Sequence, residues 1–442
     1  MSMLVRFVFV LLALGSLSAS AQKCLYTPKD LQQMNLLCDS SKWSYARMTC
    51  TDNFAIMWQK GFGYDLSCPP SLDGKPMRVD MDNLKDKLEN YYAFFRDSLQ
   101  FTRKGSKAEK YRMMVMLNYS LEGTAYGGDY DGEIGALWLA PNRVQDKRLN
   151  CIAHELGHSF QSQITCDGEG EAWGGCGFFE MTSQWMLWQV NPEWITDEKY
   201  HFDAFTKTCN KAFLHLENIY HSPYVIECWG EKHGKPFIAE LFRQGKRGED
   251  PVMTYKRLTG MTQSEFCDEM FCNVRRMVNM DFPRAWKDTR PYAGKFSTNL
   301  RATDNGWLRV EAKDCPENYG FNIIKLDVPK AGATAKVKFR GITKSDIVKA
   351  EGYVSLNPES AGWRYGLVGI DNNGKTVYGK MCSAKNGTAT LKTSKERPLS
   401  SLYLVVMGAP TRHWRNVDAW GPEGEQTPQP DAQWAYEIKN NK

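Results

Sequence analysis

Two histidines separated by three residues constrain this chain more than any other feature. His154, Glu155 and His158 form the pattern H-E-x-x-H, and residues 146–163 around them are predicted to be helical. Positions four apart return to nearly the same face of a helix, so both imidazoles can reach one metal ion. Neutral imidazole is a good zinc ligand, and the intervening carboxylate can take a proton from water held there. The motif therefore predicts a zinc site.

A catalytic zinc ion needs a third protein ligand. A continuation with a third histidine is absent, because Gln161 and Ile164 stand where glycine and histidine would be expected. We therefore expect an acidic ligand from a following helix and favour Glu180, whose apolar neighbours predict a buried carboxylate in need of a partner. The competing acids lie in the preceding glycine-rich loop, where carboxylates are usually solvated: Asp167, Glu169 and Glu171.

Strand and helix patterns surround the motif. Apolar residues recur at helical spacing over 84–99, which predicts an amphipathic helix with Asp82 as its N-cap. Residues 111–117 and 134–140 are predicted strands. Helical patterns resume at 178–190 and dominate the rest of this part of the chain.

Beyond residue 292 the pattern changes to short alternating runs. Val337 and Phe339 alternate with lysines, and residues 373–374 (Asn-Gly) are a strong hairpin signal between two apolar runs. Further strands are predicted at 402–407 and 434–438. This part of the chain is expected to be all-β.

The two patterns define the predicted architecture, an α+β fold. Residues 22–291 are expected to form helices around a small mixed sheet, and residues 292–442 an all-β sandwich or jelly roll. A length of 442 residues also favours more than one domain.

The first 21 residues predict a secretory signal peptide. Arg6 precedes an apolar run over 7–14, and the small residues 19–21 resemble a cleavage site. The apolar run is too short to span a bilayer. We expect a secreted or periplasmic chain that begins near Gln22 and has no transmembrane anchor.

Export permits disulfides, but the count of 13 cysteines is odd. Cys166 and Cys176 flank the glycine-rich loop and suit a disulfide across it, whereas Cys151 on the motif helix suits a buried thiol. We expect some pairs together with buried free thiols. The net charge of +5, from 56 basic and 51 acidic residues, is too balanced for a nucleic-acid partner.

Two other groups of side chains have alternative readings. The acidic turn with Asp129, Asp131 and Glu133 suits capping and solvation better than calcium binding. The tryptophans of the β part suit core packing, and the alternative is stacking on sugars in a glycan-binding domain: Trp307, Trp363, Trp414, Trp420 and Trp434.

The order of strands and helices around H-E-x-x-H, followed by a helix that bears Glu180, resembles the zincin metallopeptidases, in particular the gluzincins. The segments 154–161, 178–185 and 318–322 also resemble a family of secreted microbial zincin-like proteins that end in a β-sandwich. One departure from the gluzincin pattern is Gln184, which stands where an Asp often supports a ligand histidine. Its side-chain oxygen can accept the same hydrogen bond.

The resemblance implies peptide-bond hydrolysis, with zinc held by His154, His158 and Glu180. Glu155 would deprotonate a zinc-bound water for attack on a carbonyl, and a Tyr or His would stabilise the oxyanion. We expect that last residue within 215–224 and favour Tyr224 and His221. The strand segment 135–138 would pair with extended substrate backbone.

The function expected from the sequence is that of a secreted zinc metallopeptidase acting on extracellular proteins or glycoproteins. The alternative is a binding protein that keeps the zincin scaffold without turnover and binds glycan or protein. Intact His154, Glu155 and His158 favour the enzyme.

Overall fold

The computed structural model describes residues 22–123, 125–170, 173, 177–415 and 431–440, except the side chains of 345 and 346. The predicted signal peptide lies outside the described residues, as do Glu171, Cys176 and Trp420. No helix in the described ranges is long and apolar enough to cross a membrane.

The first part of the chain contains a mixed five-stranded sheet in the order β1-β2-β3-β5-β4. The three inner strands are parallel to one another, and β1 and β4 are antiparallel edges. The strands are β1 (Met48–Cys50), β2 (Phe54–Trp58), β3 (Met113–Leu117), β4 (Ala125–Tyr130) and β5 (Ile134–Leu139). Every residue of β2 and β3 is buried, as expected for strands covered on both faces.

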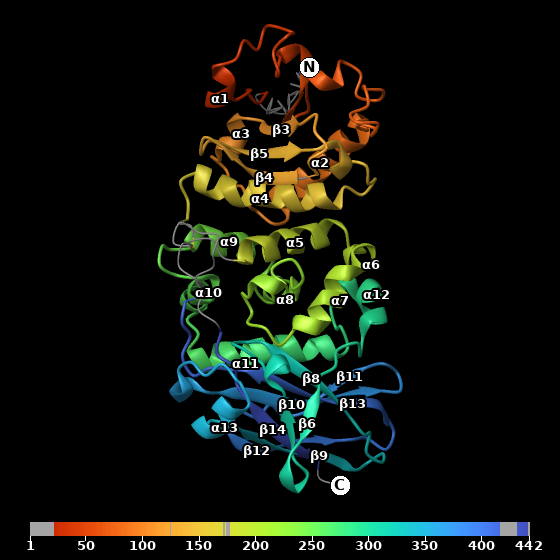
Figure 1. Ribbon diagram of the computed structural model, residues 1–442, viewed down its shortest axis with the longest axis vertical. Helices are drawn as coiled ribbons and strands as arrows, with labels where there is room; N and C mark the ends of the chain where they lie inside the picture. The colour runs from red at the N-terminus through yellow and green to blue at the C-terminus, as the bar shows by residue number, and fades with distance from the viewer. Residues whose placement is uncertain (1–21, 124, 171–172, 174–176, 416–430, 441–442) are drawn as a thin grey trace, which may run out of the picture.

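The helices of residues 150–289 follow this sheet in the chain and fill the middle of the molecule, between the sheet and the β part (Figure 1). The long helices of the whole fold are α2 (Met81–Asp97), α4 (Asn150–Cys166), α5 (Phe178–Val190), α7 (Lys199–Thr208), α8 (Tyr224–His233), α9 (Pro236–Gln244), α10 (Pro251–Thr259) and α11 (Gln263–Val274). The short ones are α1 (Lys29–Gln32), α3 (Lys107–Lys110), α6 (Trp194–Asp197), α12 (Trp286–Thr289) and α13 (Ser345–Ala350).

Helix α2 buries the predicted apolar stripe but begins two residues earlier than expected. Its N-cap is Asp80, whose carboxylate accepts the Asn83 backbone N–H at 3.1 Å. Asp82 lies in the first turn, where an acid is still favoured by the helix dipole. The N-cap predicted at Asp82 is therefore wrong, because the carboxylate two residues earlier reaches the free backbone amide.

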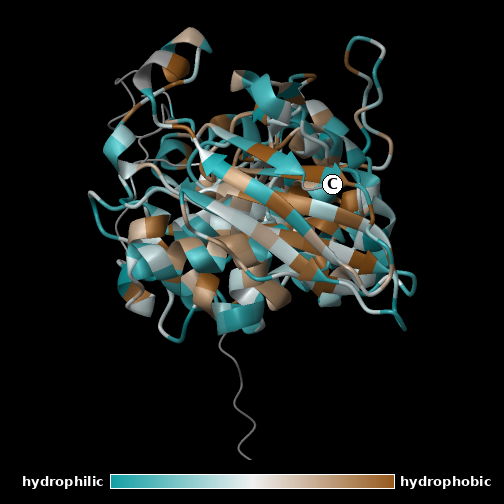
Figure 2. Cartoon of the chain, turned by 90° about the horizontal axis from the view of Figure 1, so that it is seen from below, coloured by the Kyte–Doolittle hydropathy of each residue, from teal (hydrophilic) through white to brown (hydrophobic). Residues whose placement is uncertain are grey.

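The last part of the chain forms two antiparallel sheets, ordered β11-β10-β13-β8 and β12-β9-β14-β7-β6. Their strands are β6 (Leu300–Ala302), β7 (Leu308–Val310), β8 (Phe321–Leu326), β9 (Thr334–Gly341), β10 (Trp363–Asp371), β11 (Thr376–Tyr378), β12 (Asn386–Lys392), β13 (Leu399–Gly408) and β14 (Tyr436–Asn440). The predicted Asn-Gly hairpin joins β10 and β11. Figure 2 looks onto the five-stranded sheet, where hydrophilic and hydrophobic residues alternate along the strands; β9 alternates exposed and buried positions over most of its length.

One core lies between these two sheets, and a larger one continues from the helices onto the four-stranded sheet. Leu367 and Val406 belong to the first core, whereas Val368 and Val405 belong to the second. Neighbouring residues of a strand point to opposite faces, so this sheet is covered on both sides. All nine residues of β10 are buried accordingly. The domain boundary near residue 292 remains a prediction, because the helical core extends across it.

Backbone hydrogen bonds join the two parts of the chain. Glu317 N donates to Asn210 O at 2.8 Å, and Phe321 N donates to Cys209 O at 2.8 Å. Gly320 lies between them, and a Cβ there would lie 2.1 Å from the Asn210 carbonyl oxygen. The close approach of the two segments therefore requires glycine.

The tryptophans of the β part are mainly packed against other side chains, and the described cysteines are free thiols. Trp363 and Trp434 are 2% and 3% exposed, and Trp307 lies under the Arg340 guanidinium, 4.2 Å from it. All cysteines in the described ranges are free, and the predicted partner of Cys166 lies outside them. The expected pairs do not form among the described cysteines. The buried free thiols expected from the sequence are present at Cys166, Cys209, Cys228, Cys267 and Cys315.

We expect Gly320→Ala to destabilise the protein by about 1–3 kcal/mol, because the added methyl group must displace backbone rather than a flexible side chain. Urea unfolding followed by tryptophan fluorescence measures the change. Gly128→Ala is the control, since its Cβ would meet side chains rather than backbone, the Tyr126 ring at 3.3 Å and the Trp138 ring at 3.7 Å. Equal midpoints for both variants would contradict the proposed tight contact.

Candidate metal centre

Helix α4 carries His154, Glu155 and His158 on the face that packs toward β4 and α5. The helix is 17 residues long, and 12 of them are buried. His154 is only 8% exposed, so its polar ring nitrogens need partners within the protein. The two imidazole rings lie edge to face, with their centroids 4.8 Å apart.

Glu180, in the first turn of α5, completes the cluster. Its Oε2 lies 3.0 Å from Nε2 of His154 and 3.0 Å from Nε2 of His158, and the two Nε2 atoms are 3.2 Å apart. Helices α4 and α5 can approach this closely because residue 157 is glycine: a Cβ there would lie 2.9 Å from Ser183 Oγ. The structure thus brings the predicted trio together.

Two glutamines determine which nitrogen of each imidazole carries the proton. Nδ1 of His154 lies 3.0 Å from Gln184 Oε1, and Nδ1 of His158 lies 3.0 Å from Gln161 Oε1. Both amides are oriented by backbone carbonyls, since Gln184 Nε2 donates to Tyr220 O and Gln161 Nε2 to Phe179 O. A carbonyl oxygen requires a donor opposite, so each Nδ1 is protonated and each Nε2 presents a lone pair.

The centre therefore gathers two imidazole lone pairs and a carboxylate oxygen around one point. Burial alone would raise the pKa of Glu180, but the adjacent rings of His154 and His158 outweigh it and lower the pKa. Burial would lower the pKa of His158, whereas the Glu180 carboxylate raises it. Buried acceptors that face one another need a cation between them. Two imidazoles and one carboxylate are a donor set that suits Zn²⁺.

Glu155 is held beside this cluster by the edge strand. Its Oε2 accepts the Gly127 backbone N–H at 2.8 Å, and Oε1 makes no hydrogen bond to the described residues. Burial raises the pKa of Glu155. A Cβ on Gly127 would lie 1.8 Å from the Glu155 carbonyl oxygen, so glycine allows β4 to touch α4.

The structure does not place Tyr224 at this centre, which corrects the sequence prediction. Tyr224 is 1% exposed, and its ring packs on Trp188, Phe205 and Phe282. The preceding loop instead brings Tyr220 to the site, with its ring centroid 6.0 Å from that of His154. Burial and then the charge of Glu180 raise the pKa of Tyr220. The sequence named the right segment, but not which tyrosine of it faces the cluster.

His221 lies behind the centre rather than in it. Gln184 Nε2 donates to His201 Nε2 at 3.1 Å, and His201 Nδ1 lies 2.7 Å from His221 Nδ1. Burial and the neighbouring His201 lower the pKa of His221 to about 4, so it is a neutral acceptor at neutral pH. It supports Gln184, and through Gln184 it supports His154. Sequence reasoning identified Gln184 and missed His201, which has no motif of its own.

The competing acids have other partners. Asp167 accepts hydrogen bonds from Lys107 N and Gln163 Nε2, each at 2.8 Å. Glu169 pairs with Arg243 at 2.9 Å. In the acidic turn, Asp131 accepts from Tyr26 OH and Lys29 N. Asp131 takes the capping role that the sequence favoured, whereas Asp167 and Glu169 are held by protein partners rather than only solvated.

A second group of ligand-type side chains is less suited to a metal. His215, Glu317 and Asp431 bring their ligand atoms within 4.8 Å of one another. However, Nδ1 of His215 accepts the Glu217 backbone N–H at 3.1 Å, so the neutral ring carries its proton on Nε2. Its remaining nitrogen thus offers a proton, unlike the two imidazoles of α4.

The substrate-facing strand was assigned incorrectly by sequence. Strand β5, which contains residues 135–138, lies between β3 and β4. The β4–β5 hairpin folds back so that β4 becomes the edge, with Gly127 opposite Leu137. An edge strand has an outer side that no further strand pairs, and backbone groups there can accept an extended chain. That property belongs to β4.

A model of the family of unknown function DUF6055 matches residues 17–442. The chain belongs to DUF6055. No curated protein matches its sequence.

Three solved structures show distant likeness to this DUF6055 member. The ZmpB metallopeptidase from Clostridium perfringens aligns over 84% of this chain and 68% of its own, at 14% identity and a TM-score of 0.32. The M60 catalytic domain of ZmpC from Clostridium perfringens, in complex with the sialyl T antigen, aligns over 84% and 68%, at 13% identity and 0.31. The C-terminal family 22 carbohydrate-binding module of Clostridium thermocellum Xyn10B aligns over 32% and 77%, at 12% identity and 0.18. These TM-scores are too low to carry an argument about function.

We expect Glu180→Ala to weaken zinc binding by more than the roughly 10–100-fold that loss of a ligand's supporting partner usually causes. Zinc content after dialysis against a zinc buffer, measured by mass spectrometry, reports the change. Glu169→Ala is the matched control, because Glu169 also lies after α4 in the chain but pairs with Arg243. A larger loss in Glu169→Ala would contradict the assignment of Glu180.

Proposed function

We propose that this chain is a zinc-dependent metallopeptidase that hydrolyses peptide bonds of extracellular proteins or glycoproteins. The observation that carries the proposal is the convergence of His154 Nε2, His158 Nε2 and Glu180 Oε2, with Glu155 beside them. These three side chains would hold the ion. Bound zinc would acidify water and polarise a substrate carbonyl.

The residues around the ion would each have a separate task. Glu155 is positioned by Gly127 and has one oxygen without a hydrogen bond to the described residues, so it can take a proton from water and pass it to the leaving nitrogen. Its raised pKa makes it a better base than an exposed carboxylate. Tyr220, 37% exposed, lies at the mouth of the site and would donate its hydroxyl proton to the developing oxyanion.

Strand β4 would align the substrate. Its backbone lies at the edge of the sheet, and its Gly127 N–H holds Glu155, so an added strand would lie beside the base. Such pairing uses main-chain hydrogen bonds and is tolerant of sequence. An endopeptidase acting on extended segments fits this arrangement.

The location and the β part belong to the same proposal. A signal peptide over 1–21 would deliver the chain to the outside of the cell, where protein substrates are available. The two C-terminal sheets would then contribute contacts to glycan on the substrate. Trp363 and Trp434 would take no part in such contacts, because both lie in the core.

We expect Glu155→Gln to retain zinc but to lose about 10²–10⁴-fold of its activity on casein or gelatin, because the amide cannot accept the proton. Parallel assays with chelator and with restored zinc test the role of the ion. If the wild type binds zinc and yet neither protein cleaves broad peptide and glycopeptide panels, the binding-protein alternative replaces the enzyme.

Tyr220→Phe is expected to lower kcat by about 10²–10³-fold with a smaller effect on KM, since the lost hydrogen bond forms mainly in the transition state. Tyr224→Phe is the matched control, because its buried hydroxyl makes no hydrogen bond to any residue that the structure describes. Steady-state kinetics on one fluorogenic peptide compares the two. A larger kcat loss in Tyr224→Phe would make Tyr224, not Tyr220, the oxyanion-stabilising residue.

A further inference from the structure

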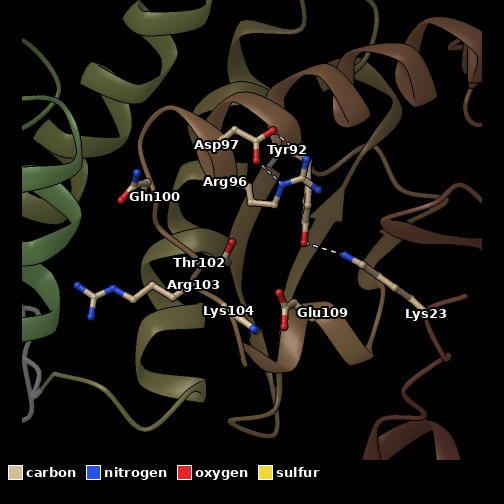
Figure 3. Close-up of a pocket in the computed structure, with 9 residues that line it drawn as sticks. All are labelled: Lys23, Tyr92, Arg96, Asp97, Gln100, Thr102, Arg103, Lys104 and Glu109. Atoms are coloured by element: carbon tan, nitrogen blue, oxygen red, sulfur yellow. Dashed lines mark hydrogen bonds and ion pairs between the residues drawn. The ribbon is translucent and has the colours of Figure 1, made fainter. Parts of the chain in front are cut away.

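A polar cavity of about 740 Å³ lies on the first part of the chain, away from the metal centre. It is bounded by the C-terminal end of α2, the segment that follows it, α3 and the start of the described chain (Figure 3). None of the residues that line it belongs to the metal cluster. Its volume is that of a typical small-ligand site.

Positive charge dominates the lining. Lys23, Arg96, Arg103 and Lys104 contribute four cations, against the carboxylates of Asp97 and Glu109. Arg103 has acidic partners beyond the cavity, Glu240 and Glu169. Lys104 makes no ion pair with the described residues, so the cavity retains an excess of positive charge.

Lys23 is the most constrained of these cations. Its ammonium donates to Asn53 Oδ1 at 2.6 Å and to Tyr92 OH at 2.9 Å, and no carboxylate of the described residues lies within ion-pair distance. Burial and then the charge of Arg96 lower the pKa of Lys23 to about 8. An ammonium has three donors, so one is left for a ligand. An anion here would supply the missing counter-charge.

The carboxylates in the lining restrict what kind of anion fits. Glu109 accepts the Gly105 backbone N–H at 2.7 Å and makes no ion pair with the described residues. Asp97 is held by Arg96 in a surface pair, 61% exposed, which is weak enough to exchange. Carboxylates repel a densely charged anion such as sulfate or phosphate but accept hydrogen bonds from hydroxyl groups. The fitting ligand has both an anionic group and several hydroxyls.

We propose that this cavity binds an acidic saccharide, with a sugar carboxylate on Lys23 and Lys104 and sugar hydroxyls on Glu109 and Asp97. Thr102 and Gln100, which also line the cavity, add a hydroxyl and an amide for polar contacts. The site is independent of hydrolysis at the metal centre. It would hold the protein on acidic glycans whether or not the metal centre is active.

Isothermal titration calorimetry with a hyaluronan tetrasaccharide, neutral chitotetraose and sodium sulfate tests the proposal on the purified protein. The hyaluronan fragment is expected to bind one per chain, and the other two at least about tenfold more weakly. Equal binding of chitotetraose would overturn the role of charge. Equal binding of sulfate would reduce the cavity to a simple anion site, and no binding of hyaluronan would overturn the proposal outright.

Substitutions locate the binding. Lys104→Ala and Lys23→Met are each expected to weaken hyaluronan binding by about tenfold, since each removes one charge-assisted contact. Lys295→Ala removes an exposed lysine elsewhere and should leave affinity unchanged. Lys104 is exposed, so its variant remains informative if Lys23→Met fails to fold. Wild-type affinity in Lys104→Ala would overturn the proposed site.

Discussion

The mutual approach of three lone-pair atoms is the constraint on which the centre of this molecule depends. His154 Nε2, His158 Nε2 and Glu180 Oε2 lie 3.0 to 3.2 Å apart in a buried setting, where unscreened acceptors repel one another. Gln184 and Gln161 hold the protons on the far side of the rings and so prevent the imidazoles from turning donors inward. The arrangement is stable when a cation occupies the middle, and that requirement explains why the polar contacts behind the rings are so complete.

The packing of the fold serves this approach. Glycine at 157 lets α5 reach α4, and glycine at 127 lets the edge strand reach the same helix from the other side. Large aromatic side chains surround these contacts: Trp185, Trp188 and Trp229 are fully buried. In a densely packed interior, side chains have little freedom to move. The positions of the three ligand-type atoms therefore follow from backbone contacts rather than from side-chain adjustment.

The β part is coupled to the helices rather than merely attached to them. One of its sheets faces the helical core with Val368 and Val405 and faces its own core with Leu367 and Val406. Backbone hydrogen bonds on either side of Gly320 tie the same sheet to the end of α7. Motions of the two parts are therefore expected to be coupled, and the sandwich would keep a fixed direction relative to the metal centre.

Much of this protein is determined by local sequence. The H-E-x-x-H spacing places two imidazoles on one helix face, the apolar neighbours of Glu180 leave its carboxylate only partly exposed, and the Asn-Gly pair sets a hairpin, because each depends only on residues within a few positions. Contacts between distant segments were decided by tertiary structure. Which tyrosine faces the cluster depends on how the loop before α8 turns, and which strand forms the sheet edge depends on how β4 folds back on β5. His201 and the cavity around Lys23 had no sequence signal, since their partners come from separate elements. Local spacing determines which side chains share a face of one helix or one turn, whereas only tertiary packing determines which elements come into contact.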